Sequence, residues 1–462
     1  MYVYLLSILA LAFTTSCTLL FILSRFRKVK NSVAFFHPYA NDAGGGERVL
    51  WFAVQALQKH DPKLKIYVYT GRSCGETPTS ILTKAQSSFG VKLSPVNFIF
   101  IKSRTLLDPK LYPFFTLLFQ SFASLLVGLE CLLRFVPSYY IDTMGSAFTY
   151  PLFRVFGGSN VACYVHYPII TSEMVTRIKS RRQLYNNRNW VANSKLLTLI
   201  KILYYRLFSF FYLFVSKFTS VVMVNSTWTY NHITQLWNRD DVLIVYPPCD
   251  TRAMKRLPLA PRENVVVAVA QFRPEKNHFL MLDAWKFMME KYGNKFSEKP
   301  VLELIGSVRP KDRAMVDSIK ERIVELGLED SVVVKENLAY IDLLARLQVA
   351  KAGLHAMTAE HFGISVVEYM ASGAIPIAHC SGGPLSDIVI PLQDGSQTGF
   401  LCSDVEEYAR ALGTVLLGNW DHLSHIQHGA RRAVKRFSQE SFIKTFLMTL
   451  STSRFFSRKK IE

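Results

Sequence analysis

The sequence predicts an α/β protein: two doubly wound domains with parallel sheets that face a cleft, preceded by a transmembrane helix. Three observations predict this architecture. Short apolar segments alternate with helical patterns along most of the chain, the alternation starts afresh in the second half, and an uncharged apolar run opens the sequence. The chain has 462 residues, half of them hydrophobic, which is enough for two or three domains with large cores.

The first element is the apolar run over residues 3–24, which carries no charge. About 20 apolar residues suffice to cross a bilayer. Four basic residues follow at once: Arg25, Arg27, Lys28 and Lys30. A cleavable signal peptide carries its positive charge before the apolar run, so we interpret residues 1–30 as a signal anchor, with a cleaved leader as the alternative. The positive-inside rule then predicts a lumenal N-terminus and cytosolic domains.

A Rossmann-like domain is predicted over residues 31–246. Its strands are expected at 32–36, 65–69, 96–101, 138–142, 161–165 and 220–224. A proline-rich linker, 247–263, separates it from a second Rossmann-like domain over 264–440. The strands of that domain are expected at 264–270, 301–306, 331–335, 352–357, 375–379 and 399–402. Residues 441–462 are expected to form a C-terminal helix and a basic tail.

Three consecutive glycines, Gly44, Gly45 and Gly46, stand between the first of these strands and a helical pattern. A glycine run costs conformational entropy and therefore needs a reason. In this position it lets a bulky group approach the backbone and meet the free N–H groups of a helix N-terminus, which favour phosphate. A tight packing turn is the alternative. The run is not G-x-G-x-x-G, so it does not indicate a dinucleotide.

The charge balance is strongly basic, with 54 basic and 35 acidic residues and a formal net charge of +19. No motif that reads nucleic acid is present, so this balance favours lipid and phosphorylated substrates as partners. Two further apolar stretches bear on lipid. We expect 111–129 to be a buried helix, although it is long enough to span a bilayer. The aromatic stretch 201–217, framed by basic residues, suits a helix in the membrane interface, with a core helix as the alternative.

The densest candidate for chemistry lies at 358–384 in the second domain. Glu360 falls in the loop after an expected strand, Gly363 permits a close approach of the backbone, and a short helix is expected over 364–371. The N-terminus of that helix offers a second phosphate site. Glu368 lies just over one turn into the helix, where its carboxylate can accept from two sugar hydroxyls. A single helical glutamate is more often a solvated surface residue, but the glycine pair after the next strand favours function.

These residues resemble a known family. Glu360 and Glu368 around "HFGISVVEYMASGAIPI" are similar to the E-x7-E motif of retaining glycosyltransferases of the GT-B type, and "FRPEKNH" resembles their phosphate-clamp loop. The glycine run resembles their first-domain glycine loop. Many relatives have an arginine five residues before the clamp lysine, where this chain has Gln271. The clamp is therefore assigned to Arg273 and Lys276, a guanidinium and an ammonium suited to a departing diphosphate.

The stretches "HPYANDAGGGERVLW", "IDTMGSAFTYPLF" and "VYPPCDT" narrow the resemblance to the α-1,2-mannosyltransferases of the dolichol pathway. The resemblance implies transfer from GDP-mannose, with retention, of the fourth and fifth mannoses to a dolichol-pyrophosphate-linked oligosaccharide. It places this step of N-glycan assembly at the cytosolic face of the endoplasmic reticulum membrane. Other mannosyltransferases of the pathway are candidate partners, and nucleic acid is not expected.

The resemblance implies that the domain over 31–246 is the acceptor side and faces the membrane, and that the domain over 264–440 binds the nucleotide-sugar donor. It also implies roles for single residues. His166, at the end of an expected strand, would contact the donor sugar, whereas a satisfied structural histidine is the alternative. His166 and Glu360 are therefore the expected catalytic residues. Donor binding is expected from Gly44, Gly45, Gly46, Arg273, Lys276, Gly363, Ile364, Ser365 and Glu368. No D-x-D motif occurs, so no metal or other cofactor is expected.

Three other functions fit parts of the pattern. A GT-B transferase that uses a UDP-sugar shares every physical feature, and only the family motifs favour mannose. A dinucleotide oxidoreductase needs a G-x-G-x-x-G after a strand, which is absent. A non-catalytic membrane scaffold on the same fold would be free to lose Glu360, Lys276 or His166, and all three are present.

Overall fold

The structure is a computed structural model that describes residues 2–42, 44–73, 75–170, 195–453 and 455–456. The chain forms two compact units. Unit 1 comprises Met1–Asn225, Thr229–Val245 and Ile443–Glu462, and unit 2 comprises Ser226–Trp228 and Tyr246–Phe442. The expected basic tail lies mostly outside the described residues, because 457–462 are not among them.

Unit 1 is built on a seven-stranded parallel sheet with the strand order β3-β2-β1-β4-β5-β6-β7. The strands are β1 (Lys28–Phe36), β2 (Lys65–Gly71), β3 (Asn97–Ile101), β4 (Val136–Asp142), β5 (Asn160–Val165), β6 (Val221–Val224) and β7 (Val242–Ile244). The first six match the strands expected from the sequence. The short edge strand β7 was not expected, because its three residues carry too little pattern to be recognised.

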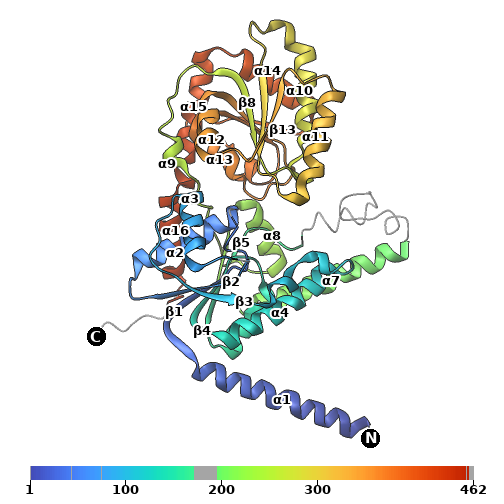
Figure 1. Ribbon diagram of the computed structural model, residues 1–462, viewed down its shortest axis with the longest axis vertical. Helices are drawn as coiled ribbons and strands as arrows, with labels where there is room; N and C mark the ends of the chain where they lie inside the picture. Colours follow the sequence, from blue (N-terminus) through green and yellow to red (C-terminus); the bar gives the residue numbers. More distant parts are fainter. Residues whose placement is uncertain (1, 43, 74, 171–194, 454, 457–462) are drawn as a thin grey trace. The chain divides into compact units, whose positions relative to one another are not determined.

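The helices of unit 1 cover its sheet (Figure 1). They are α2 (Gly45–His60), α3 (Pro78–Phe89), α4 (Thr116–Arg134), α7 (Lys195–Ser216) and α8 (Thr227–Trp237), with a 3-10 turn η1 (Ser103–Leu107) after β3. Helix α2 places a continuous apolar face, from Val49 to Leu57, against the sheet. The last helix, α16 (Gln439–Thr452), belongs to unit 1 from Ile443 onward.

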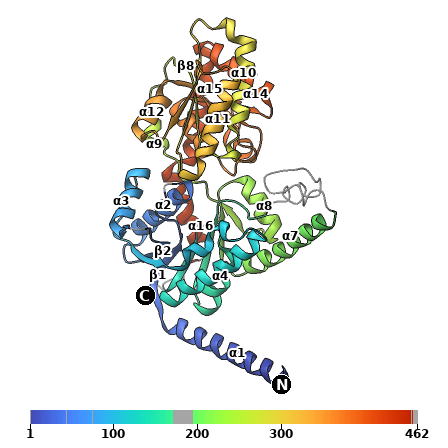
Figure 2. The ribbon, with the colours of Figure 1, turned by 45° about the vertical axis from the view of Figure 1, so that its right-hand side comes forward.

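Unit 2 repeats the plan with a six-stranded parallel sheet in the order β10-β9-β8-β11-β12-β13. Its strands are β8 (Glu263–Val269), β9 (Val301–Gly306), β10 (Val332–Glu336), β11 (Ala350–His355), β12 (Ile375–His379) and β13 (Phe400–Cys402). Its helices are α9 (Thr251–Met254), α10 (His278–Tyr292), α11 (Arg313–Glu325), α12 (Tyr340–Val349), α13 (Ile364–Ser372), α14 (Val405–Leu417) and α15 (Trp420–Ala433). The turned view in Figure 2 shows helices on both faces of this sheet. The predicted doubly wound fold class is thereby confirmed.

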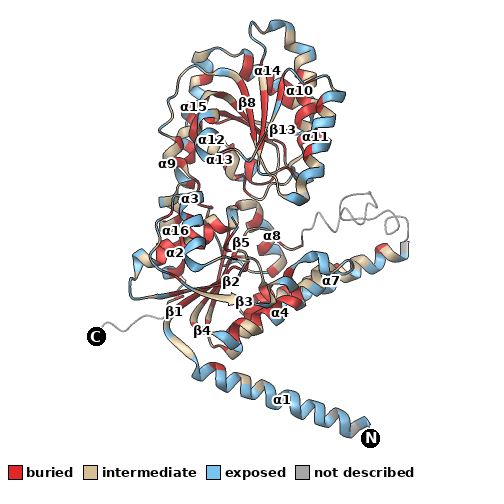
Figure 3. Cartoon of the chain, in the orientation of Figure 1, coloured by how far each residue is buried: buried red, intermediate tan, exposed pale blue. Residues whose placement is uncertain are grey.

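Among the described residues, three helices are long and apolar enough to cross a membrane: Ser7–Phe26 within α1 (Tyr2–Phe26), Thr116–Arg134 and Leu196–Ser216. Figure 3 shows α1 exposed along nearly its whole length. The expectation of a buried helix over 111–129 was wrong in part. Helix α4 starts at Thr116 and buries one face, while Phe119 and Phe122 on another face are 48% and 47% exposed. An uncharged run gives no sign of which face turns away from the sheet.

Candidate functional site

In unit 2, the side chains that follow the two central strands meet each other. Lys276 lies in the loop after β8, and Glu360 lies in the loop after the neighbouring strand β11. The strand order changes direction between these two strands, so their connections diverge to opposite sides of the sheet. Lys276 Nζ lies 2.5 Å from Glu360 Oε2 and 3.1 Å from Met357 Sδ. This is the position at which open α/β sheets bind ligands.

Glu360 is an almost buried carboxylate held by two basic side chains. Besides Lys276, its Oε2 lies 3.1 Å from Nε2 of His355, the last residue of β11. The Glu360 side chain is 13% exposed and that of His355 is 3% exposed. Burial alone would raise the pKa of Glu360, but Lys276 and His355 outweigh burial and hold that pKa well below its usual range. The carboxylate is therefore ionised at every physiological pH.

The loop that carries Glu360 is fixed by the chain that follows β12. Ala359 has a left-handed backbone, with φ +54°, and its N–H donates to Ser381 Oγ at 2.7 Å. The N–H of Gly383 donates to the carbonyl oxygen of Glu360 at 2.7 Å. A Cβ on Gly382, where φ is +60°, would lie 2.2 Å from that same oxygen. The glycine pair is required because two backbones approach each other here.

The loop before α10 is shaped by two residues with restricted backbones. Pro274 opens a 3-10 turn, η5 (Pro274–Lys276), and Asn277 with φ +54° redirects the chain into the helix. The result aims Lys276 at Glu360. Arg273, the other predicted clamp residue, lies 3.7 Å from Glu275 and its side chain is 32% exposed. A weak exposed pair of this kind leaves a guanidinium available for an anion.

Helix α13 begins at Ile364 directly after the Glu360 loop. Its N-cap is Gly363, with φ +110°, and no side chain caps the helix there. The first N–H groups, those of Ile364 and Ser365, therefore stand at an end of positive dipole. A Cβ on Gly363 would lie 3.6 Å from the Glu360 side chain, so the helix start and the carboxylate are neighbours. The half-buried Glu368 lies one turn further along the same helix.

The opposite end of α13 is held by cationic and amide side chains. Arg262 Nη2 and Arg431 Nη2 donate to the carbonyl oxygen of Ser372 at 2.5 Å and 3.1 Å. Arg431 Nε also donates to the carbonyl oxygen of Ala371, and Gln427 donates to that of Gly373. Cations at the carboxyl end complement the helix dipole. Side-chain hydrogen bonds therefore hold the carboxyl end of α13, while its amino end is open to an anion.

Unit 1 has a comparable contact at its own switch point, between β1 and β4. His37 follows β1 and Thr143 follows β4, and His37 Nδ1 lies 2.8 Å from Thr143 Oγ1. His37 Nε2 lies 3.1 Å from Oε1 of the buried Glu47. Glu47 in turn accepts the N–H of Gly44 at 2.7 Å. The N–H of Gly44 is thus occupied as part of the cap of α2, where the sequence predicted a free group.

His166 lies beside the glycine run, as the first residue after β5. Its Nε2 lies 3.2 Å from the carbonyl oxygen of Thr143, and its ring packs at 4.9 Å from that of Tyr164. A Cβ on Gly46 would lie 3.6 Å from His166 Nε2, so this glycine and His166 are neighbours within unit 1. Gly45 is the first residue of α2. The expected roles of these residues toward the donor remain predictions.

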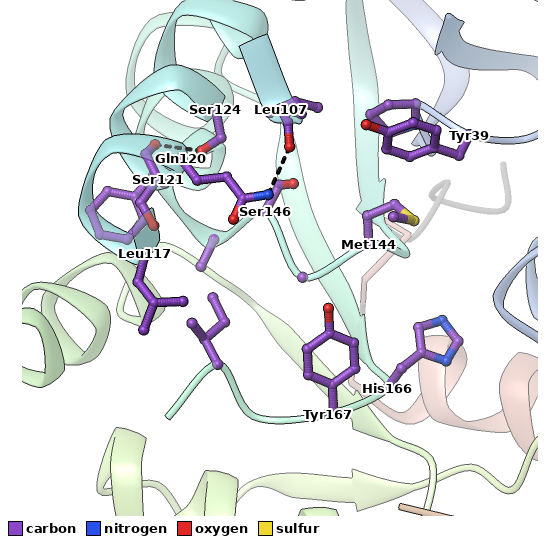
Figure 4. Close-up of a pocket in the computed structure, with 15 residues that line it drawn as sticks. Tyr39, Leu107, Leu117, Gln120, Ser121, Ser124, Met144, Ser146, His166 and Tyr167 are labelled. Carbon is purple, nitrogen blue, oxygen red and sulfur yellow. Dashed lines mark hydrogen bonds between the residues drawn. The ribbon is translucent and has the colours of Figure 1, made fainter. Parts of the chain in front are cut away.

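A cavity of about 190 Å³ opens beside His166 within unit 1 (Figure 4). It lies at the carboxyl ends of β1, β4 and β5 and is closed on one side by helix α4. Its lining residues are Pro38, Tyr39, Leu107, Leu117, Gln120, Ser121, Ser124, Met144, Gly145, Ser146, Ala147, Phe148, His166, Tyr167 and Ile169.

Several residues of these sites were not predicted from the sequence. His355 ends a strand of ordinary apolar pattern, and His37 and Glu47 flank the glycine run without a motif of their own. A polar residue at the carboxyl end of a central strand is the signal that would have found His37 and His355. Among the described residues, no group of three or more His, Cys, Asp or Glu is placed to hold a metal ion. Metal independence remains a prediction.

Comparison with known proteins gives matches over both halves of the chain. Residues 30–237 match the family described as ALG11 mannosyltransferase N-terminus, and residues 250–433 match that described as glycosyl transferases group 1. The GDP-Man:Man(3)GlcNAc(2)-PP-Dol alpha-1,2-mannosyltransferase of Xenopus laevis is 43% identical over 427 residues, which are 91% of this chain and 87% of that protein. The protein of the same name from Homo sapiens is 43% identical over 428 residues, 90% of this chain and 86% of that protein.

Solved structures with the same fold include Anabaena Alr3699/HepE in complex with UDP and glucose. That chain has a TM-score of 0.61 and 15% identity, and the match covers 91% of this chain and 99% of that one. The sucrose-phosphate synthase of Thermosynechococcus elongatus has a TM-score of 0.63 and 16% identity, covering 92% of this chain and 100% of that one. At these identities the likeness establishes the fold, which is the predicted GT-B arrangement of two parallel α/β domains.

Proposed function

The chain belongs to the family of the GDP-Man:Man(3)GlcNAc(2)-PP-Dol alpha-1,2-mannosyltransferases, and from this membership we propose the reaction that its residues perform. It is a glycosyltransferase that transfers mannose from GDP-mannose to a dolichol-pyrophosphate-linked oligosaccharide in α-1,2 linkage. The fourth and fifth mannoses are the ones added. The geometric observation that carries the proposal is the ionised Glu360, paired with Lys276 beside the uncapped start of α13.

The donor diphosphate is held by unit 2. Arg273 and Lys276 supply the cationic groups, and the N–H groups of Ile364 and Ser365 supply hydrogen-bond donors at the positive end of α13. Within the described part of the chain, Lys276 Nζ donates to the Glu360 carboxylate and to Met357 Sδ, so its third N–H bond can point to a phosphate oxygen. Glu368, on the same helix, accepts from the ribose hydroxyls. Gly44, Gly45 and Gly46 remain predicted donor contacts.

The chemical step breaks the bond between mannose C1 and the diphosphate and forms a bond from C1 to the acceptor 2-hydroxyl oxygen. The acceptor attacks from the face that GDP leaves, so the α configuration is retained and the hydroxyl proton leaves with the departing diphosphate. Stabilisation of that leaving group and positioning provide most of the rate enhancement. The low pKa of Glu360 suits a carboxylate that faces developing positive charge on the mannose and makes it a poor proton donor. His166 contacts the donor sugar.

The membrane attachment follows from the three apolar helices. The exposed α1 spans the endoplasmic reticulum membrane with its N-terminus in the lumen, and both units are cytosolic. Helices α4 and α7 lie side by side in both views of the ribbon, and the N–H of Leu118 on α4 donates to the Tyr204 hydroxyl on α7 (Figures 1 and 2). Their outward faces carry exposed leucine and phenylalanine side chains, which rest in the bilayer interface.

The experiment that tests this function is transfer of radiolabelled mannose from GDP-mannose to a trimannosyl, pyrophosphate-linked lipid acceptor, with EDTA present. UDP-glucose and UDP-N-acetylglucosamine run in parallel as donors. Two successive additions that an α-1,2-mannosidase removes are expected, and they would establish donor, linkage and metal independence together. Turnover of a UDP-sugar without turnover of GDP-mannose would leave the fold intact and contradict the proposed donor.

A further inference from the structure

The cavity beside His166 has a lining that selects for a neutral ligand. Histidine aside, none of the described residues that line it carries a titratable charge: they include no Asp, Glu, Lys or Arg. The guanidinium of Arg104 lies behind this lining, 5.3 Å from the Tyr39 ring and 3.5 Å from the carbonyl oxygen of Pro38, and does not itself line the cavity. A phosphate in the cavity would therefore be desolvated without a direct ionic partner, which is costly. The lining instead combines amide and hydroxyl groups with the aromatic side chains of Tyr39, Phe148 and Tyr167. Hydroxyl and amide partners beside aromatic faces are what a sugar ring requires.

The size of the cavity points to a small occupant. At about 190 Å³ it is below the range of about 300–1,000 Å³ that holds drug-sized ligands. One sugar ring is of this scale, whereas a whole nucleotide-sugar is not. The cavity is therefore too small for the whole donor, whose diphosphate is assigned to unit 2.

One face of helix α4 supplies polar side chains to the cavity. Leu117, Gln120, Ser121 and Ser124 all line the cavity, and their spacing of three and four residues places them on one face of the helix. Gln120 Nε2 donates to the carbonyl oxygen of Leu107 at 2.7 Å, which fixes the amide and leaves its oxygen as an acceptor (Figure 4). Ser124 is held by a 2.6 Å hydrogen bond to the carbonyl oxygen of Ser121. These polar groups interrupt a stretch of the helix, 117–129, that is otherwise apolar.

The opposite stripe of α4 faces outward and is apolar. Phe119, Phe122 and Leu126 are 48%, 47% and 58% exposed. At 100° per residue this stripe lies about half a turn away from the stripe that contains Gln120 and Ser124. One helix therefore presents a lipid-compatible face on one side and a polar cavity wall on the other.

A buried carboxyl group holds the chain segment that forms the cavity wall opposite α4. Asp142, the last residue of β4, accepts the N–H of Met144 at 2.9 Å and the hydroxyl of the buried Tyr150 at 2.6 Å. The next residue, Thr143, presents its carbonyl oxygen to His166 Nε2. The segment that supplies Met144, Gly145 and Ser146 to the lining is thus anchored at its start. A held loop of this kind suits recognition of one ligand shape.

We propose that this cavity seats the terminal mannose of the acceptor oligosaccharide, with Gln120 and Ser146 bonding its hydroxyls and His166 at the end where the attacking hydroxyl lies. The inference rests on the proposed function, because it takes the acceptor to be a neutral, lipid-linked oligosaccharide. It adds that α4 contacts both the oligosaccharide and the lipid of this substrate. Its inner stripe binds the sugar and its outer stripe meets the lipid.

The test compares the full-length wild-type protein with the variants Gln120→Leu and Ser146→Ala. The readouts are KM for the trimannosyl lipid acceptor, KM for GDP-mannose, and equilibrium binding of the acceptor without donor. Loss of hydrogen bonds to a sugar hydroxyl is expected to raise the acceptor KM and its dissociation constant about tenfold for Gln120→Leu and several-fold for Ser146→Ala. KM for GDP-mannose should stay within twofold of the wild-type value. If the two side chains were needed only for the structure of unit 1, the substitutions would be expected to change both KM values.

Gln58→Leu is the matched control. Gln58, on α2 of the same unit, also donates from its amide to a backbone carbonyl oxygen, that of Ser94 at 2.9 Å, and does not line the cavity. Its acceptor affinity should equal that of the wild type. Unchanged acceptor binding in both test variants, or equal losses in all three, would overturn the proposal. The equilibrium binding measurement contains no donor, so it tests acceptor binding even if GDP-mannose turns out not to be the donor. Failure of this inference can therefore be told apart from failure of the proposed function.

Discussion

Lys276 and Glu360 are 84 residues apart in the chain and 2.5 Å apart between Nζ and Oε2. His37 and Thr143 have the same relationship in unit 1: they are 106 residues apart in the chain and 2.8 Å apart between Nδ1 and Oγ1. In each unit the first residue of the pair follows the first strand of the sheet, and the second follows the strand paired beside it across the switch point. The fold thus creates a polar contact twice, at equivalent places, from residues with little else in common.

Replacing Lys276 with alanine should abolish most transfer activity. The change removes a cation from the diphosphate site and leaves the nearly buried Glu360 with His355 alone, so we expect kcat to fall by about 10²–10³. Steady-state transfer with GDP-mannose checks this. Lys286→Ala is the control, because Lys286 forms an exposed ion pair with Glu290 in the same unit. Unchanged transfer by Lys276→Ala would contradict the assigned site.

Glu360→Gln should reduce transfer by the same factor at every pH from 5 to 8. Lys276 and His355 hold the pKa of Glu360 far below this window, so the wild type keeps its carboxylate ionised throughout. The ratio of wild-type to variant kcat is the quantity to measure. A ratio that approaches one toward pH 5 would show that Glu360 titrates near neutrality and that its surroundings are not those described.

Gly382→Ala should lower both stability and transfer more than Gly395→Ala does. Both glycines have positive φ, +60° and +79°, so alanine carries a similar backbone strain at each, about 1–2 kcal/mol. A Cβ on Gly382 would also collide with the backbone of Glu360, whereas a Cβ on Gly395 has nothing within 4 Å. Thermal unfolding and transfer assays separate the shared strain from the collision. Equal behaviour of the two variants would mean that the Glu360 loop tolerates displacement.

Unit 2 should lose stability in mild acid through His278. This residue starts α10, is fully buried, and neither ring nitrogen has a hydrogen-bond partner among the described residues. Burial and the charge of Lys276 lower its pKa to about 4. The unfolded chain takes up this proton near pH 6.5, so between pH 6.5 and 4 unfolding binds a proton and stability falls as pH falls.

The expected size of this effect is about 2 kcal/mol between pH 7.5 and pH 5. His278→Leu should remove it, because leucine fills a similar volume and does not titrate. Denaturant unfolding of the full-length protein in detergent at the two pH values measures the difference. An identical pH dependence in wild type and variant would show that His278 is not the group responsible.

The sequence predicted the strands and the helix after Glu360 well, because buried parallel strands are short apolar runs and α13 ends at a glycine. It assigned Lys276 and Glu360 to one site only through a resemblance to known enzymes. It did not show that the two residues touch, or that His355 joins them, because those contacts depend on which strands are neighbours in the sheet.

Helix α4 illustrates the limit in another way. Its run of apolar residues predicted burial, and the interruption at Gln120 was visible, but the run does not say which face packs on the sheet. That depends on the neighbouring loop around Ser146 and on Leu107, which accepts the Gln120 amide. The role of Glu47 could not be predicted for a similar reason. Its carboxylate accepts the N–H of Gly44 and contacts His37, and these contacts depend on how the chain turns between β1 and α2.

The two ends of α13 should respond differently to genetic drift. Its carboxyl end is held by Arg262, Arg431 and Gln427, which reach it from two separate segments of the chain and partly share the same carbonyl oxygens. Such redundancy lets a lineage lose one of these side chains and regain another without losing the helix. At the amino end, no side chain of the described residues caps the helix at Gly363, so there is no second group there to compensate for a substitution.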